Sequence, residues 1–114
     1  MRIIECVPNF SEGRDKDVIS LITSEITKFS DLKLLDVDMG YDTNRTVVTF
    51  AGDPEIVIKA AFDAIERAST LINMNIHEGA HPRMGATDVC PLIPISNITM
   101  DECVTFSKIL SKRV

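Results

Sequence analysis

The sequence predicts one α/β domain, an α+β sandwich in which helices cover one face of a β-sheet. Three segments carry apolar residues at helical spacing, and the segments between them are short apolar runs rich in β-branched residues. Helix-capping residues mark the borders between the two kinds of segment. The resulting order of elements is β-α-β-β-α-β-α. At 114 residues the chain can bury one modest core, so a single domain is expected.

Four strands are expected, over residues 3–7, 32–38, 46–50 and 89–95. A short polar turn joins the second and third strands, which predicts an antiparallel hairpin. The fourth strand contains Pro91 and Pro94, which remove ladder hydrogen bonds, so it is expected to be irregular or to lie at a sheet edge. Pro8 and Asn9 are expected to end the first strand in a loop.

Three helices are expected: one over residues 15–29, one that opens at Asp53 and one that opens at Thr99. Asp53 is a good cap and is followed by a proline at the first helical position. Thr99 and Glu102 fit a capping box. The order of elements resembles the ferredoxin-like arrangement, with a mixed sheet and helices on one face. The third helix meets no glycine or proline stop signal, so we expect residues 1–114 to be a domain truncated in its last helix.

Composition limits the classes of partner. The net charge of −5 argues against a general affinity for nucleic acid. No window approaches the roughly 18 apolar residues of a membrane span, and the first residues do not form a secretory signal. We therefore expect a cytoplasmic protein without nucleic-acid or membrane partners. Cys6, Cys90 and Cys103 lie in apolar stretches without a C-x-x-C pair, which favours buried, reduced thiols.

Residues 77–88, here called the histidine loop, hold both histidines of the chain, one arginine, two carboxylates and two glycines. The residues from His77 to His81 match the zinc-protease pattern H-E-x-x-H, which binds metal only when it is helical. Pro82 disfavours a helical conformation at His81, and Gly79 adds roughly 1 kcal/mol against a helix. A zinc site is therefore disfavoured, and the density of polar and reactive side chains in this segment indicates an active-site loop with no metal. The alternative is an ordinary surface turn.

Polar side chains gather in four clusters: residues 8–13, residues 36–38, residues 43–46 and the histidine loop. Polar groups at strand ends can converge in one cleft. His81 is the best candidate for proton transfer, because histidine titrates near neutrality and Pro82 fixes the backbone beside it. Asp38 can orient His81 or stabilise a cationic substrate; the alternative is a solvated strand end.

Two further residue types are open to two interpretations. Arg83 can hold a carboxylate by a bidentate contact, or it can form a surface salt bridge with Glu78 or Asp88. Asn9 and Asn44 belong to a type that forms turns more often than it binds ligands. The residues by themselves thus predict a small α/β domain with a polar site centred on a histidine.

Four motifs follow one another along the chain: ECVPNFSEG at residues 5–13, LLDVD at 34–38, TNRTV at 43–47 and HEGAHPRMGATDV at 77–89. In this order they resemble the N-terminal signature and the active-site loop of the glutamate formimidoyltransferases, or formiminotransferases. PLIP at 91–94 and DEC at 101–103 continue the match. The resemblance spans essentially the whole chain, and it implies the N-terminal subdomain of that family.

The resemblance implies transfer of a formimino group from N-formimino-L-glutamate to tetrahydrofolate, the co-substrate, in histidine degradation. It implies that His81 is the catalytic acid and base. It also implies that Asp38 stabilises the amidinium charge or orients His81. Arg45 and Arg83 become candidates for binding substrate carboxylates, and Asn9 joins the substrate-binding set.

Two departures from the family pattern matter. Ala80 stands where the family often has an acidic residue before the histidine. The family's transferase module has two subdomains with folate bound between them, and this chain resembles only the first. The resemblance therefore implies a C-terminal subdomain in cis or in trans as partner, or a homodimer. The alternative function is a non-catalytic folate- or partner-binding module that has kept the fold.

Overall fold

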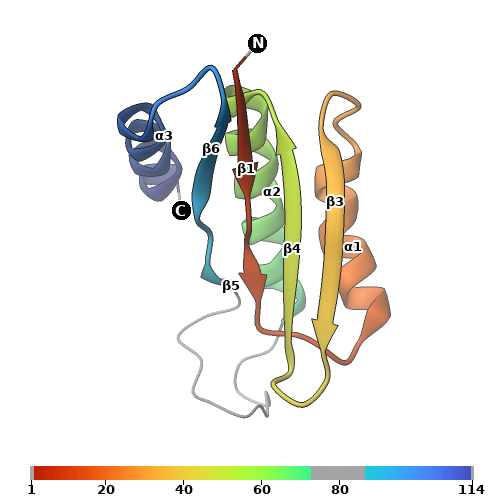
Figure 1. Cartoon of the computed structure of the whole chain (residues 1–114). Coiled ribbons are helices and arrows are strands. Elements are labelled where there is room, and N and C mark those ends of the chain that lie inside the picture. The colour runs from red at the N-terminus through yellow and green to blue at the C-terminus, as the bar shows by residue number, and fades with distance from the viewer. Residues whose placement is uncertain (1, 73–86, 114) are drawn as a thin grey trace.

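The fold is a two-layer α+β sandwich, seen in a computed structural model that describes residues 2–72 and 87–113. A β-sheet forms one layer, and α1 and α2 lie behind it in the view of Figure 1. The third helix, α3, lies beside the outer strand β6 and packs against α2 and β6. One face of the sheet is therefore covered by helices. The opposite face, here called the open face, carries no helix among the described residues.

The six strands of the sheet lie in four adjacent rows, because β1 and β2 share one row and β5 and β6 share another. Its strands are β1 (Ile3–Cys6), β2 (Asn9–Phe10), β3 (Lys33–Gly40), β4 (Arg45–Gly52), β5 (Thr87–Val89) and β6 (Leu92–Ser96). β4 pairs with β3 along one side and with both β1 and β2 along the other. β6 extends the sheet beyond β1, and β5 extends it beyond β2. Each of these pairings is antiparallel.

The two faces of the sheet follow from the alternation of side chains along each strand. On β4 the even-numbered residues from Thr46 to Phe50 are buried under the helices, while their odd-numbered neighbours belong to the open face. Ile4 and Cys6 continue the buried row on β1. A bulge between Leu34 and Asp36 interrupts β3. The buried side chains of sheet and helices form one core.

The helices are α1 (Lys16–Thr27), α2 (Pro54–Leu71) and α3 (Met100–Arg113). Asp53 caps α2, since its carboxylate accepts the backbone N–H of Glu55 at 3.0 Å. Thr99 and Glu102 form the expected reciprocal capping box, with 3.0 Å and 3.1 Å bonds. α2 presents several alanines to the sheet, which lets helix and sheet approach closely. None of the described helices is long and apolar enough to cross a membrane.

The α+β sandwich and the hairpin predicted between the second and third strands are confirmed. The sheet differs from the mixed sheet expected, because each pairing between described strands is antiparallel. The row order β6-β1-β4-β3 nevertheless follows the ferredoxin-like scheme, in which each crossover skips one row.

Two local corrections concern the prolines. Asn9 was expected in a loop, but it lies in β2 and pairs with Val47. Pro8 has no N–H, yet its carbonyl accepts the backbone N–H of Val48 at 3.0 Å, so the chain stays paired with β4 past the proline. The single strand expected over residues 89–95 is divided into β5 and β6 around Pro91, which has no N–H to donate. β6 lies at the sheet edge and its pairing with β1 shifts register, as Pro91 and Pro94 predict.

Candidate functional site

The loop after β2 and the turn between β3 and β4 are tied together at one end of the sheet. The backbone N–H of Gly13 donates to the buried Asn44 side-chain oxygen at 2.8 Å. The Thr46 hydroxyl, also buried, donates to the backbone carbonyl of Glu12. Asn44 has a φ of 51°, a left-handed conformation that asparagine tolerates better than most residues. Two of the four polar clusters in the sequence therefore form one framework.

Gly13 is required by close backbone contact at this junction. A Cβ atom at this position would overlap the Gly40 carbonyl oxygen and the Arg45 backbone nitrogen. Arg14 reinforces the junction from outside, because its Nε donates to the Tyr41 carbonyl at 2.9 Å and its guanidinium lies 5.0 Å from the centre of the Tyr41 ring. The framework thus holds the loop firmly against the turn.

Three of the candidate site residues meet on the open face beside this framework. Asn9 on β2 and Asp38 on β3 are both register partners of Val47, one on each side of β4. Partners in an antiparallel pair project from the same face, and Arg45 shares that face because it lies two residues before Val47. With strands about 4.8 Å apart, Asn9 and Asp38 are separated by about two row spacings. The structure therefore brings the three polar residues around one valine.

The three side chains differ in their surroundings. Asp38 is exposed, which keeps its carboxylate available to a ligand or to solvent. The Asn9 amide donates to the Val7 carbonyl at 3.2 Å, so the backbone just before β2 holds its orientation. Arg45 is partly buried. The group combines an acidic, an amide and a cationic side chain on one surface.

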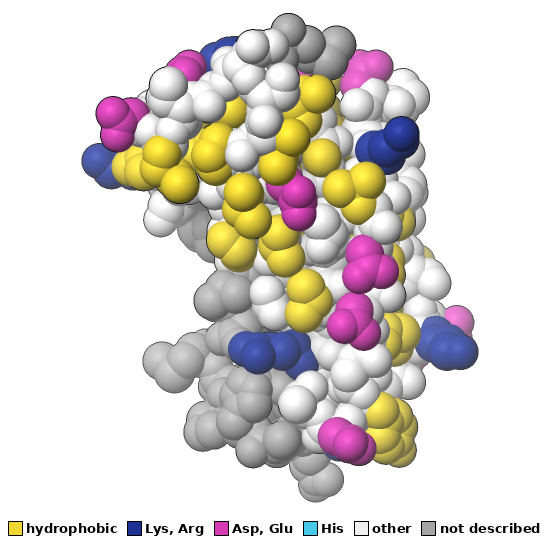
Figure 2. Space-filling view, viewed as in Figure 1, with side chains coloured by type: hydrophobic (Ala, Val, Ile, Leu, Met, Phe, Trp, Pro, Cys, Tyr) yellow, Lys and Arg dark blue, Asp and Glu magenta, His cyan; other side chains and the backbone are white. Residues whose placement is uncertain are grey.

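The surface around this group is largely apolar. Figure 2 shows hydrophobic side chains gathered over the face that is turned away from α1 and α2, with acidic side chains beside them. On β6, Ile93 and Ile95 point outward with 41% and 54% of their surface exposed. Leu35, at the bulge of β3, is 50% exposed. Large apolar side chains in such numbers on one face are typical of a contact surface.

His81 and Arg83, the remaining candidates, lie outside the described residues. The last two residues of the histidine loop belong to β5, which pairs with β2 at Asn9 and Phe10. This pairing places the end of the fourth motif in the strand row next to Asn9. Within residues 2–72 and 87–113, no group of three or more His, Cys, Asp or Glu side chains is arranged to hold a metal ion.

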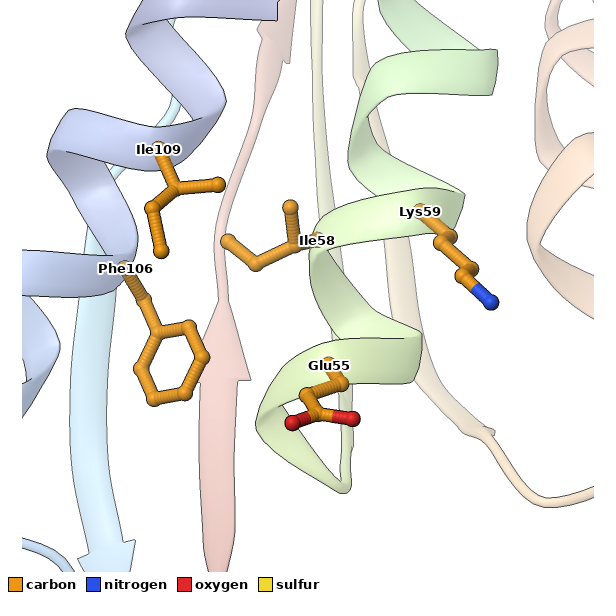
Figure 3. A pocket seen from close by; sticks show the side chains of 5 residues that line it. All are labelled: Glu55, Ile58, Lys59, Phe106 and Ile109. Carbon is orange, nitrogen blue, oxygen red and sulfur yellow. The ribbon is translucent and has the colours of Figure 1, made fainter.

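Two pockets lined by described residues lie elsewhere in the molecule. Figure 3 shows one of about 240 Å³ between α2 and α3, where Ile58, Phe106 and Ile109 point toward one another while Lys59 points away. It is smaller than the usual 300–1,000 Å³ of a small-molecule site and belongs to the helix layer. A second pocket, of about 450 Å³, lies at the far end of β3 and β4, beside Lys33 and Gly52. Neither is lined by Asn9, Asp38 or Arg45.

Comparison with known proteins decides the family. Residues 3–114 match the model of the formiminotransferase domain, N-terminal subdomain. The chain belongs to this family. The N-terminal subdomain of the formiminotransferases thus accounts for nearly every residue of the sequence, as the four motifs predict.

Relatives of this subdomain occur in two kinds of protein. The chain is 51% identical over 113 residues to formimidoyltransferase-cyclodeaminase of Dictyostelium discoideum, and 51% identical over 113 residues to that of Rattus norvegicus. In both cases the match covers 99% of this chain and 21% of the relative. Glutamate formimidoyltransferase of Thermoplasma acidophilum is 45% identical over 114 residues, which are 100% of this chain and 38% of the relative. The chain therefore spans well under half the length of these relatives.

Sequence reasoning missed two features of the formiminotransferase subdomain. Gly13 and Thr46 hold the loop after β2 against the turn between β3 and β4. The only sequence signal for them was their position in the motifs at residues 5–13 and 43–47. The contact between Cys6 and Cys90, whose Sγ atoms are 3.3 Å apart, had no signal in the sequence because 84 positions separate the two residues.

Proposed function

We propose that this chain supplies the N-terminal half of a glutamate formimidoyltransferase, which transfers a formimino group from N-formimino-L-glutamate to tetrahydrofolate in histidine degradation. The observation that carries this proposal is the family match over residues 3–114, together with relatives named glutamate formimidoyltransferase. Tetrahydrofolate is the second substrate, and the reaction as proposed needs no metal.

The reaction requires a proton donor. N5 of tetrahydrofolate attacks the amidine carbon, and a tetrahedral intermediate forms. The bond between this carbon and the glutamate nitrogen then breaks, and the glutamate leaves as an amine that takes up a proton. His81 gives this proton after removing one from the attacking nitrogen, a role that suits a group titrating near neutrality.

Asp38 stabilises the positive charge of the amidinium group or orients His81. Its carboxylate is exposed on the open face, flanked across Val47 by Asn9, and this supports a role in contacting the donor substrate. Arg45 and Arg83 bind carboxylates of the substrates, for which the planar guanidinium is well shaped. Asn9 offers an oriented amide to the same substrate.

The open face receives the C-terminal subdomain, supplied in cis or in trans, or a second copy of the chain. Exposed Ile93 and Ile95 support this assignment, because they would be desolvated by such a contact. Folate binds between the two subdomains. A chain that spans 21% to 38% of its relatives' length is consistent with a site completed by another segment.

The test is an assay of the purified chain with formiminoglutamate and tetrahydrofolate, alone and mixed with a separately prepared C-terminal subdomain. We expect turnover only in the mixture. His81→Ala should lower kcat by about 10²- to 10⁴-fold at unchanged stability. Asp38→Asn should also lower turnover. Asp36→Asn is the matched control, because Asp36 is exposed on the same face of β3 but pairs with Thr49 rather than with Val47.

Two outcomes would contradict the proposal. Equal activity of the His81→Ala mixture and the unmodified mixture would exclude His81 as the acid and base. Binding of folate or of the C-terminal subdomain without any transfer would support the alternative, a non-catalytic folate- or partner-binding module.

A further inference from the structure

Two of the three cysteines face each other inside the molecule. Cys6 on β1 is fully buried, and Cys90 lies between β5 and β6 and is partly exposed. Their Sγ atoms are 3.3 Å apart, within hydrogen-bonding distance for sulfur. Cys103, on α3, is buried and has no sulfur partner among the described residues. The chain therefore holds one dithiol pair and one isolated thiol.

The strand pairing holds the two thiols together. Cys6 pairs with Leu92 across the β1–β6 ladder, and the Val7 N–H donates to the Pro91 carbonyl at 3.1 Å, immediately beside Cys90. A disulfide needs sulfur atoms about 2.0 Å apart, so the pair would have to close by roughly 1.3 Å. Cys90 belongs to neither strand, so that a shift at this residue disrupts no ladder pair.

The two thiols are electrostatically unequal. The hydrogen bond with Cys90, then burial, raises the pKa of the Cys6 thiol. The hydrogen bond with Cys6 lowers the pKa of the Cys90 thiol against the effect of its burial. Cys90 is also the more exposed of the two, so solvent stabilises a negative charge better on its sulfur. Burial and the Glu102 carboxylate raise the pKa of Cys103, which makes this thiol less reactive.

We propose that Cys6 and Cys90 form a redox-modification site, in which a hydroperoxide oxidises them to a reversible disulfide. The Cys90 thiol loses its proton, and the thiolate attacks one oxygen of the hydroperoxide. The O–O bond breaks to give a sulfenic acid on Cys90, and the leaving alkoxide or hydroxide takes up the released proton to become an alcohol or water. The Cys6 sulfur then attacks the sulfenic sulfur. The S–S bond forms, the S–O bond breaks, and the leaving hydroxide departs as water with the Cys6 proton. A small dithiol restores both thiols by exchange.

The disulfide would connect β1 to the link between β5 and β6. It would close a chain segment of 84 positions, and a cross-link over so long a segment restricts the unfolded chain strongly. The same link restrains the β5 segment, which leads out of the histidine loop and pairs with β2. The oxidised chain should therefore be more resistant to unfolding than the reduced chain.

The test treats the full chain with hydrogen peroxide, alkylates the remaining thiols under denaturing conditions and maps the products by mass spectrometry. Trypsin combined with a glutamate-specific protease is needed, because cleavage after Glu102 separates Cys90 from Cys103. We expect a Cys6–Cys90 cross-link that lacks two hydrogens, an alkylated Cys103, and loss of the cross-link on reduction with dithiothreitol. The midpoint temperature of unfolding should rise on oxidation and fall back on reduction.

Three variants complete the test. Cys103→Ala should form the cross-link as the unmodified chain does. Cys6→Ala should stop at a Cys90 sulfenic acid, which a dimedone probe traps. Cys90→Ala should leave Cys6 as a free thiol. Further oxidation of Cys90 without a cross-link in the unmodified chain, or a disulfide formed between two chains, would overturn the proposal. Both observations are made on the unmodified sequence, so they do not depend on how the variants fold.

Discussion

At the scale of single residues, the site depends on which face of a strand each side chain occupies. Asn9 and Asp38 lie 29 positions apart in the sequence and flank the same residue on one face of the sheet only because both pair with Val47. The bulge at Leu35 decides that Asp36 and Asp38 share the open face, since the extra residue resets the alternation along β3. One residue inserted or removed there would turn Asp38 toward the helices.

A prediction at this scale concerns Gly13. Its replacement by alanine should lower the free energy of unfolding by about 1–3 kcal/mol, because the added methyl group overlaps backbone atoms of Gly40 and Arg45 that cannot rotate away. Urea unfolding measures the change. Gly40→Ala is the matched control, since its closest neighbour would be the Thr43 hydroxyl, a side chain that can move. Equal losses in both variants would contradict the argument.

At the scale of elements, the helix layer is joined by packing and by one small charged network. α1 and α2 are in direct contact, and both place apolar side chains against the sheet. Lys28, at the C-terminal end of α1, lies 2.8 Å from Glu25 of the same helix and 2.9 Å from Asp63 of α2. This lysine is exposed, so the core supplies most of the attraction between the helices and the network adds a little.

A prediction at this scale follows from the charge of Lys28. Its hydrogen bonds, first with Glu25 and then with Asp63, raise the pKa of the Lys28 ammonium group. A pKa raised by folding means that the stabilisation is complete below the pKa of the unfolded chain, about 10.4, and is lost as the pH rises through the folded value. The Lys28→Met variant should therefore be slightly less stable than the unmodified chain near neutral pH and equal to it in strong alkali.

Urea midpoints of the two chains, measured between about pH 7 and pH 12, check this expectation. Lys108→Met on α3 is the control, because Lys108 has no acidic partner within 4.0 Å among the described residues. A Lys28 effect that does not change with pH would show that the methylene chain, and not the charge, accounts for the difference.

At the scale of the whole molecule, the sheet has one covered and one uncovered face. The covered face forms the core, and the open face combines exposed isoleucines with the group around Val47. The polar group around Val47 and the exposed apolar side chains therefore share one side of the domain. A partner that docks there would at the same time shield the site from water, which strengthens its charge interactions.

A prediction at this scale tests the docking surface. Ile95→Asn should weaken association with the C-terminal subdomain at least about tenfold, because the 54% exposed side chain would be buried in the complex. The variant should leave the chain's own stability within about 0.5 kcal/mol. Leu21→Asn is the matched control, since Leu21 is 42% exposed on α1, in the opposite layer. Titration of the subdomain against each variant measures the difference, and equal affinities would exclude this face.

The sequence by itself determined the helices, the central hairpin and the family. Periodicity and caps depend on residues close together in the chain, so α2 at Asp53, the box of Thr99 and Glu102, and the hairpin were all predictable. The four motifs determined the family for the same reason, since each is a contiguous run. Pro91 also predicted an irregular edge, although not the division into β5 and β6.

Only the tertiary structure decided which distant residues meet. The row order of the sheet depends on burial by all elements together, so the antiparallel pairing throughout, the place of Asn9 in β2 and the meeting of Asn9, Asp38 and Arg45 could not be derived from local pattern. The same reason hid the contact of Cys6 with Cys90. The local sequence sets the backbone conformation of a segment and which of its side chains are apolar. Which strands pair in the sheet depends on the packing of the whole domain.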